Sequence, residues 1–388
     1  MTPSARYAAA IDILDRILTG EASEKVLTTW ARSNRYAGSG DRAAIRDLVF
    51  EAVRCRASYG HLGGANTGRG IMIGLARAQG MDVNTLFSGD KYAPDALSPE
   101  EQETHNLADA PRSVRLDCPE WLLPLFDTSL KDQADAVLEL SRTRAPVFLR
   151  VNTAKTDRDR AIHALADDGV IAIEHPLSET ALEVRENPRR VAVGETFQSG
   201  MVELQDAASQ AVVDALPLDG TSHVLDFCAG GGGKSLAIAA KGAGRVVAHD
   251  ALPARMKDIP DRAKRAGAKM KILTLPEIGD DKFDLVLCDV PCSGSGSWRR
   301  SPDGKWDLTQ DRLDELVSVQ MSVLEEAAEF VGENGVLAYV TCSMFDVENA
   351  QQVEAFIQGH PEWSVQKSHQ FTPLDDGDGF HISLLTRV

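Results

Sequence analysis

The spacing of apolar residues divides the chain into a helical first third and an alternating remainder. Over residues 5–57, apolar side chains such as Leu14 and Leu18 recur near helical spacing, and Gly38-Ser-Gly40 interrupts them. Asp41 follows the interruption and could cap the next helix. Two more helices are predicted over residues 71–78 and 121–140, around a polar stretch at 88–112.

A different pattern begins near residue 146. Strands are predicted at 147–151 and 181–184, with a helix at 157–168 between them. After residue 221, predicted strands and helices alternate. The strands are 224–226, 245–250, 271–275, 283–289 and 336–341, and the helices are 233–241, 255–266 (interrupted by Pro260) and 313–330. This alternation is typical of a doubly wound, Rossmann-like parallel sheet.

Three domains follow from these changes of pattern. We expect an all-α domain at 1–140, a small α+β linking subdomain at 141–215 and an α/β catalytic domain at 216–388.

Two apolar runs end at cysteines. The first leads into Asp289-Val-Pro-Cys292-Ser-Gly-Ser-Gly296, and the second into Val340-Thr-Cys342-Ser343. Ligands of open α/β sheets bind outside the carboxyl ends of the strands. If both runs are parallel strands, two thiols and a carboxylate converge on one cleft.

A glycine-rich loop follows the first strand of this domain. Four consecutive glycines, 230–233, precede Lys234 at the start of a helix, so the backbone can approach a ligand closely. Asp250 ends the next strand, where a carboxylate can accept hydrogen bonds from ribose hydroxyls. Loop and acid together indicate a nucleoside cofactor, and S-adenosylmethionine fits as well as NAD.

Charge argues against a simple nucleic-acid binder, because the net charge is −17. Residues 1–60 carry nine basic and seven acidic side chains, whereas 61–140 carry six and thirteen. RNA contacts would therefore need local basic clusters. The clusters are Arg142, Arg144 and Arg150; Arg185, Arg189 and Arg190; and Arg299, Arg300 and Lys305.

The six cysteines form no Cys-x-x-Cys pair and have no histidines at zinc-like spacing, so we expect reduced thiols and no metal. No apolar run is long enough to span a membrane, and residues 1–7 do not resemble a secretory signal. We expect a cytoplasmic protein and a monomer.

The motifs resemble those of the RNA cytosine-5 methyltransferases, in particular the bacterial Sun/Fmu (methyltransferase B) group that modifies small-subunit ribosomal RNA. Residues 289–306 are similar to the family's fourth motif, and 337–349 to its sixth. Residues 205–209 and 378–382 resemble its lead-in and its final strand, and the first 140 residues look like a divergent form of its helical domain, related to an antitermination factor.

The resemblance implies an S-adenosylmethionine-dependent methyltransferase that acts on C5 of a cytosine in RNA, with RNA as its partner. C5 becomes nucleophilic only after a thiolate has added to C6. Cys342 would be this nucleophile, Cys292 would assist product release, Asp289 would hold the cytosine edge, and Lys234 would support the cleft electrostatically.

For such an enzyme, the glycine loop, Asp250 and the basic clusters predict the residues that contact each ligand. The cofactor would contact Cys228, Ala229, Gly230, Gly231, Gly232, Gly233, Lys234, Asp250, Arg255 and Asp289. RNA would contact Arg142, Arg144, Arg150, Arg299, Arg300 and Lys305.

Three departures from the family pattern concern the cofactor. The family's usual Ala-Pro-Gly-Gly-Lys-Thr is Gly230-Gly-Gly-Gly-Lys-Ser235 here, so the rigidity of the proline is lost. No aspartate stands in register after the third strand, where the chain reads Leu273-Thr-Leu-Pro-Glu277. Pro260 interrupts a helix that is normally continuous.

Other interpretations stay open. An NAD-dependent oxidoreductase would explain the glycine loop and Asp250 but would leave both cysteine motifs unused. An RNA-binding or assembly factor with a degenerate cofactor site would explain the altered loop. DNA is a less suitable substrate, because DNA cytosine methyltransferases use the fourth-motif cysteine as the nucleophile and lack the second one.

Overall fold

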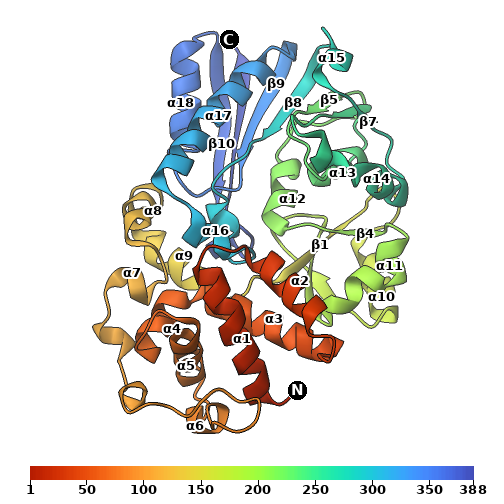
Figure 1. Cartoon of the computed structure of the whole chain (residues 1–388). Coiled ribbons are helices and arrows are strands. Elements are labelled where there is room, and N and C mark those ends of the chain that lie inside the picture. Colours follow the sequence, from red (N-terminus) through yellow and green to blue (C-terminus); the bar gives the residue numbers. More distant parts are fainter. The chain divides into compact units, whose positions relative to one another are not determined.

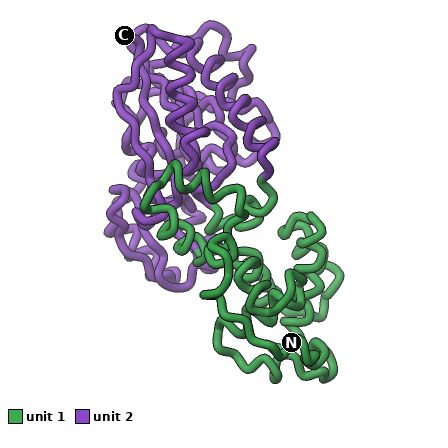
Figure 2. Tube along the Cα trace, turned by 90° about the vertical axis from the view of Figure 1, so that its left-hand side faces the viewer, with its two compact units in different colours: residues 1–144, 298–308 green, residues 145–297, 309–388 purple.

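The computed structural model describes residues 1–388 and divides into two compact units, coloured separately in Figure 2. Unit 1 contains residues 1–144 and 298–308, and unit 2 contains 145–297 and 309–388. The first boundary lies close to the predicted residue 140. The predicted catalytic domain at 216–388 was wrong for residues 298–308, which pack with the helices of unit 1.

Unit 1 is all-helical, and its core is built from apolar faces of the first five helices. The helices are α1 (Pro3–Leu18), α2 (Ser23–Ser33), α3 (Ser39–Arg54), α4 (Arg56–Gly63), α5 (Gly68–Ala78), α6 (Val83–Leu86), α7 (Arg112–Arg115), α8 (Leu123–Leu130), α9 (Ala134–Ser141) and α16 (Asp303–Asp307), with 3₁₀ helices η1 (Glu100–Gln102), η2 (Leu107–Asp109), η3 (Glu120–Leu122) and η4 (Lys131–Gln133).

Two local predictions in unit 1 were wrong. Helix α3 begins at Ser39 without a side-chain cap, and Asp41 instead accepts hydrogen bonds from the amino terminus of Met1 and from Arg6. The single helix expected over 121–140 is split into α8 and α9. Lys131 lies between them with a φ of +53°, a left-handed conformation that an α-helix cannot contain.

Unit 2 contains a small antiparallel sheet with the strand order β2-β3-β1-β4. The elements are β1 (Val147–Val151), α10 (Arg158–Asp167), β2 (Ile171–Glu174), β3 (Ala181–Glu186), η5 (Pro188–Val193), α11 (Glu195–Gln198) and β4 (Val202–Leu204). The predicted strand at 147–151 and helix at 157–168 are confirmed. Strands β2 and β4 were missed because both are short and present mostly polar or exposed positions.

The second sheet of unit 2 has the order β10-β11-β9-β8-β5-β6-β7. The strands β9, β8, β5, β6 and β7 are parallel, and β11 and β10 are antiparallel additions at one edge. The strands are β5 (His223–Asp226), β6 (Arg245–Ala248), β7 (Lys271–Ile272), β8 (Phe283–Asp289), β9 (Val331–Thr341), β10 (Trp363–Phe371) and β11 (Phe380–Arg387). The Rossmann-like α/β sheet is therefore confirmed.

Helices cover both faces of this sheet, as the ribbon in Figure 1 shows. They are α12 (Ala207–Asp214), α13 (Gly233–Ala240), α14 (Ile259–Ala266), α15 (Leu275–Ile278), α17 (Gln310–Ala328) and α18 (Ala350–Gly359), with η6 (Pro253–Met256), η7 (Ser295–Ser297) and η8 (Pro373–Asp375). Neighbouring strand residues point to opposite faces: Leu225 packs with α17 and α18, and Val224 packs with α12 and α13. No helix in either unit is both long and apolar enough to cross a membrane.

Candidate active site

The two cysteine loops leave neighbouring parallel strands at the same edge of the sheet. Asp289 at the end of β8 pairs with Val340 near the end of β9, so the loops that follow lie side by side. The Sγ atoms of Cys292 and Cys342 are 3.3 Å apart, and the amide of Gly296 donates to the carbonyl of Cys342. The structure thus brings the two thiols together, as the strand pattern predicted.

An ion pair between buried Lys234 and half-buried Asp289 lies beside the thiols. Lys234, in the first turn of α13, is 2.7 Å from Asp289 through its Nζ atom, and its ammonium also lies over the ring of Phe380. Burial acts to lower the pKa of Lys234, but Asp289 and, to a smaller extent, Cys342 outweigh it, so the pKa is raised. Lys234 therefore stays positively charged next to the thiols.

The pairing of the two thiols affects the protonation of Cys292. The hydrogen bond with Cys342, followed by burial, raises the pKa of Cys292 well above its ordinary value. Cys292 therefore keeps its proton at neutral pH, so it is suited to donate a hydrogen bond rather than to attack as a thiolate.

A fully buried carboxylate ties the two cysteine loops together. Glu348 accepts hydrogen bonds from the amide and hydroxyl of Ser293 (2.7 and 2.5 Å), from the hydroxyl of Ser343 and from Gln320 (3.0 Å). Ser293 directly follows Cys292, and Ser343 directly follows Cys342. One side chain therefore fixes the backbone next to both thiols.

Further buried polar contacts hold the loop after β9. Asn349 accepts from the Thr341 hydroxyl at 2.5 Å and donates to the carbonyl of Ser343 at 2.9 Å, while the amide of Met344 donates to Ser295 at 2.8 Å. No role was predicted from the sequence for Glu348, Asn349 or Gln320. Gln320 stands among apolar residues of a predicted helix, and such a residue is buried only where hydrogen bonds compensate its desolvation, whereas Glu348 and Asn349 stand in a polar run that gives no such signal.

The glycine loop joins β5 to α13. Gly230 and Gly232 have φ values of +51° and +78°, and a Cβ atom on Gly232 would stand 2.9 Å from the Ile259 side chain. No side chain caps α13, so its first amides are not covered by a capping side chain. The loop therefore presents bare backbone, as expected where a ligand approaches closely.

Asp250 follows β6 beside this loop and is buried. Its Oδ2 accepts from the amide of Gly230 at 2.9 Å and its Oδ1 from the amide of Leu252 at 2.9 Å, and Arg255 lies 3.2 Å from Oδ2. Oδ2 thus has two partners, whereas Oδ1 has a second lone pair that a ribose hydroxyl can use.

Asp226, at the end of β5, lies beneath the same loop. It accepts a 2.5 Å hydrogen bond from Ser235 through Oδ2, whereas its buried Oδ1 has no hydrogen-bond partner. Burial raises the pKa of Asp226 to about 7, and Ser235 opposes this only partly.

These features fit an adenosyl cofactor better than a dinucleotide. The bare glycine loop, the α13 amides and Asp250 can hold a nucleoside. Lys234, which directly follows the glycine loop, is already paired with Asp289.

Two of the expected departures have local explanations. Glu277 accepts from the amide and hydroxyl of Thr274 and so caps α15, which leaves this acid engaged in the helix cap rather than directed at a nucleoside. Pro260 lies in the first turn of α14, where its missing amide hydrogen costs no helical bond. The predicted interruption is thus the start of a shorter helix.

Three basic residues expected to contact RNA are buried instead. Lys305 is 2% exposed, donates to the carbonyl of Arg54 at 3.2 Å, and has its pKa lowered by burial. Arg299 is 6% exposed and donates to Thr143 at 3.2 Å. The prediction that these side chains contact RNA was wrong, because the aromatic residues flanking them, Trp298 and Trp306, anchor the segment within unit 1.

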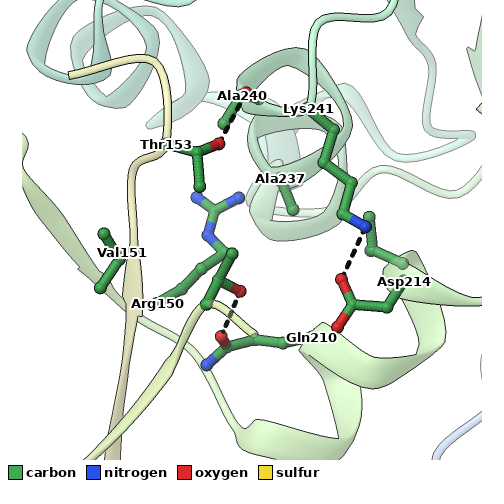
Figure 3. A pocket seen from close by; sticks show the side chains of 10 residues that line it. Arg150, Val151, Thr153, Gln210, Asp214, Ala237, Ala240 and Lys241 are labelled. Carbon is green, nitrogen blue, oxygen red and sulfur yellow. Dashed lines mark hydrogen bonds and ion pairs between the residues drawn. The ribbon is translucent and has the colours of Figure 1, made fainter. Parts of the chain in front are cut away.

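Arg150 is the third of these residues, and it lines a small pocket in unit 2 (Figure 3). Its side chain is 3% exposed, its Nε and Nη1 atoms have no hydrogen-bond partner, and burial lowers its pKa to about 10. Thr153 and the ion pair of Lys241 with Asp214 border the same pocket. Arg150 was therefore also wrong as a surface contact.

Arg142 and Arg144, two further members of the predicted basic clusters, differ in how free their side chains are to contact RNA. Arg142 is paired with buried Asp117 at 2.9 Å and with Glu139 at 2.8 Å. Arg144 is 64% exposed at its side chain and forms only a loose ion pair with Asp47 at 3.4 Å. Arg144 is thus much better placed than Arg142 to meet a polyanion.

The other four cysteines lie apart from the thiol pair. Cys55 and Cys118 are buried in unit 1, and burial raises the pKa of each to about 12, which fits a structural role. Cys288 is fully buried in the sheet core, and Cys228 lies in the glycine loop with its pKa raised by burial.

Comparison with known proteins agrees with this geometry. Residues 213–385 match the family model of the 16S rRNA methyltransferase RsmB/F, and residues 118–191 match the ferredoxin-like domain of the RsmF/B-like methyltransferases. Ribosomal RNA small subunit methyltransferase B of Citrobacter koseri is 34% identical over 285 residues, and that of Escherichia coli is 33% identical over 290. The chain belongs to the RsmB/F methyltransferase family. Both alignments cover 69% of this chain and 66% of the relative's length.

Solved structures agree with the fold of an RsmB/F methyltransferase. The crystal structure of PH0851 superposes with a TM-score of 0.78 at 22% identity and covers 100% of this chain and 99% of that chain. NSun6 from Pyrococcus horikoshii, solved with SFG, has a TM-score of 0.62 at 18% identity and covers 70% of this chain and 98% of that chain. RsmB/F proteins are S-adenosylmethionine-dependent methyltransferases, which identifies the cofactor that the glycine loop and Asp250 fit.

Proposed function

We propose that this protein transfers a methyl group from S-adenosylmethionine to C5 of a cytosine in small-subunit ribosomal RNA. The observation that carries the proposal is the 3.3 Å approach of Cys292 and Cys342 beside the Lys234–Asp289 pair. Family membership supports methylation of ribosomal RNA, and the thiol pair supports cytosine C5 as the position.

The reaction begins at Cys342. Its thiolate adds to C6 of the cytosine, and the electrons of the C5–C6 double bond move into the ring and make C5 nucleophilic. Lys234, which stays positively charged, lies on the side of the cleft where Cys342 attacks. Asp289 can accept a hydrogen bond from the cytosine amino group, which orients the ring over the sulfur atom.

S-adenosylmethionine, when bound, supplies an electrophilic methyl group on a sulfonium sulfur. Asp250 and the 230–233 loop would hold its nucleoside part. After C5 has been methylated, a base removes the C5 proton and the Cys342–C6 bond breaks. Cys292 retains its proton and lies 3.3 Å from the departing sulfur atom, so it can donate a hydrogen bond to the regenerated thiolate.

RNA would be recognised outside the thiol site by the small sheet of unit 2 and by unit 1. The family model that matches residues 118–191 covers part of both regions. Among the predicted basic residues, the exposed Arg144 is a candidate phosphate contact. Ribosomal RNA as the substrate would place the activity in the cytoplasm.

Covalent trapping tests the chemistry. Cys342→Ala should abolish methyl transfer while RNA binding remains, because the ring is no longer activated. Cys292→Ala should accumulate a covalent RNA–protein adduct, because elimination stalls after methylation. Denaturing gels with labelled RNA would show a shifted band for Cys292→Ala alone, and Cys288→Ala serves as a control outside the thiol pair. A shifted band only with Cys342→Ala would reverse the roles of the two thiols.

Binding data would separate this proposal from its alternatives. S-adenosylmethionine rather than NAD should raise the melting temperature of the full chain, since a ligand stabilises the state that binds it. Stabilisation by NAD alone would favour the oxidoreductase. Stabilisation by neither, with RNA still bound, would favour an assembly factor.

A further inference from the structure

The glycine loop is held from outside by two arginines of the segment that follows β6. Arg255 reaches the loop indirectly, because it pairs with Asp250, which accepts the amide hydrogen of Gly230. Arg262, on α14, donates directly to the carbonyl of Gly231. The loop is thus bound at two successive residues, once through an amide and once through a carbonyl.

Arg262 is itself fixed by a carboxylate. Glu203 on β4 lies 3.5 Å from Nε of Arg262 and 2.7 Å from Nη2 of Arg265, and its side chain is 9% exposed. Arg265 is held in turn against the ring of Phe197, 4.2 Å from its centroid. The guanidinium of Arg262 is half-buried and already oriented by Glu203. It therefore loses little additional conformational entropy when it binds the carbonyl of Gly231.

A glycine at residue 231 leaves Arg262 the space that it occupies, which a larger side chain would crowd. A Cβ atom on Gly231 would stand 3.0 Å from Nη1 of Arg262, and one on Gly230 would stand 3.3 Å from Nη2 of Arg255. These residues stand where the family pattern has alanine and proline. The glycines that remove the rigidity of the loop therefore also admit the two guanidinium groups.

We propose that Arg262 is a positioning residue for the cofactor loop, which replaces the rigidity of a proline at position 231 by a clamp on the carbonyl of Gly231. The proposal rests on S-adenosylmethionine being the ligand of this loop. Glu203 aligns the clamp, and it belongs to the small sheet that we expect to contact RNA. Where the family pattern has a loop stiffened by proline, this chain has a flexible glycine loop held by the side chain of Arg262.

The clamp should appear in cofactor affinity rather than in the chemical step. Arg262→Ala should weaken S-adenosylmethionine binding by about ten-fold, the equivalent of one lost charge-assisted hydrogen bond. The KM for S-adenosylmethionine should rise similarly, with kcat and the KM for RNA little changed. Amide hydrogens of residues 230–232 should exchange faster in the variant without ligand. Arg262→Lys should restore part of the affinity.

Arg265→Ala is the matched control, because Arg265 pairs with the same Glu203 but does not touch the loop. It should leave the affinity for S-adenosylmethionine within about two-fold of the unmodified protein. A Gly231→Ala exchange tests the shared space. It should weaken S-adenosylmethionine binding in the unmodified protein. The loss of affinity should be smaller in the Arg262→Ala background, because no guanidinium is left to displace.

The outcomes separate the clamp from the function. Unchanged affinity in Arg262→Ala, or equal losses in Arg262→Ala and Arg265→Ala, would overturn the clamp while leaving the methyltransferase intact. The clamp would also be overturned if the losses of affinity caused by Gly231→Ala and Arg262→Ala were additive. Failure of the unmodified protein to bind S-adenosylmethionine at all would instead refute the proposed function.

Discussion

The cysteine loops and the glycine loop meet at one edge of the sheet but are held in opposite ways. The cysteine loops are bound from within by Glu348, which is fully buried and accepts hydrogen bonds from both of them. The glycine loop is bound by the buried Asp250 and, from outside, by Arg262, whose side chain is 22% exposed. Buried polar networks rigidify a site, whereas partly exposed contacts can open and close.

The difference matches what each loop must do. In the proposed reaction, two sulfur atoms at 3.3 Å would have to keep their separation through addition and elimination, and small displacements at a reacting centre are costly. The glycine loop, as the proposed cofactor loop, would have to admit S-adenosylmethionine and release the demethylated product in every cycle. Rigidity at the thiols and adjustable contacts at the cofactor are therefore suited to the same reaction.

Removal of the buried carboxylate should have the largest effect. Glu348→Ala leaves several buried donors without an acceptor and should destabilise unit 2 by about 4 kcal/mol. Glu348→Gln keeps the shape of the side chain and should preserve more stability, yet still lower kcat with little change in the KM for S-adenosylmethionine. Urea unfolding and steady-state kinetics measure both effects. Glu354→Ala, an exposed glutamate on α18, should be neutral. A stable Glu348→Ala variant with full activity would remove the basis of the comparison.

Asp226, which lies beneath the glycine loop, should make the free energy of unfolding depend on pH. Because the pKa of Asp226 is about 7 in the folded state, above its ordinary value, the folded chain holds a proton that the unfolded chain has lost between about pH 4 and 7. The stability from this group is complete below this range and is lost as the pH rises through 7. Asp226→Asn should therefore gain up to about 3 kcal/mol relative to the unmodified chain between pH 5 and pH 8.

Urea unfolding of both proteins at pH 5 and pH 8 gives this difference. A constant difference between the two proteins at both pH values would mean that Asp226 is ionised in the folded state like an ordinary surface carboxyl.

Loss of Asp250, the expected ribose acceptor, should weaken cofactor binding without disturbing the thiols. Asp250→Ala should reduce S-adenosylmethionine binding by about 1.5–3 kcal/mol, because a charged hydrogen-bond acceptor is lost. Calorimetry measures the affinity, and alkylation of Cys342 by iodoacetamide should proceed as in the unmodified protein. Asp261→Ala, an exposed aspartate of α14, is the control. Unchanged affinity would mean that the nucleoside is held elsewhere.

The smallest effect is expected away from both loops. Arg144→Ala should reduce the salt dependence of RNA binding by about one phosphate contact and should leave the affinity for S-adenosylmethionine unchanged. Filter binding at several salt concentrations measures the slope. Arg312→Ala, an exposed residue paired with Glu315 on α17, should leave the slope unaltered. Lys305→Ala should instead lower the stability of unit 1, because the side chain is buried there.

Much of unit 2 could be predicted because its signals are local. Buried parallel strands read as apolar runs, so β8 was predicted with its observed bounds, and Cys292 and Cys342 follow strands that end at the same edge. The glycine loop and Asp250 were found in the same way. The prediction was wrong for residues 298–308, because sequence patterns group a segment with its neighbours in the chain. In the structure Trp298 is buried and Trp306 is partly buried against the core of unit 1.

The sequence by itself determined the alternating sheet, the two cysteine motifs and the position of the cofactor loop, because hydrophobic periodicity and turn residues act over short distances. Only the tertiary structure decided which polar residues are buried and what they bind. Glu348 reaches Ser293 across 55 residues, and Arg262 reaches Gly231 across 31. Such contacts depend on the packing of whole strands and helices, which no local pattern records, and they set the rigidity of each loop.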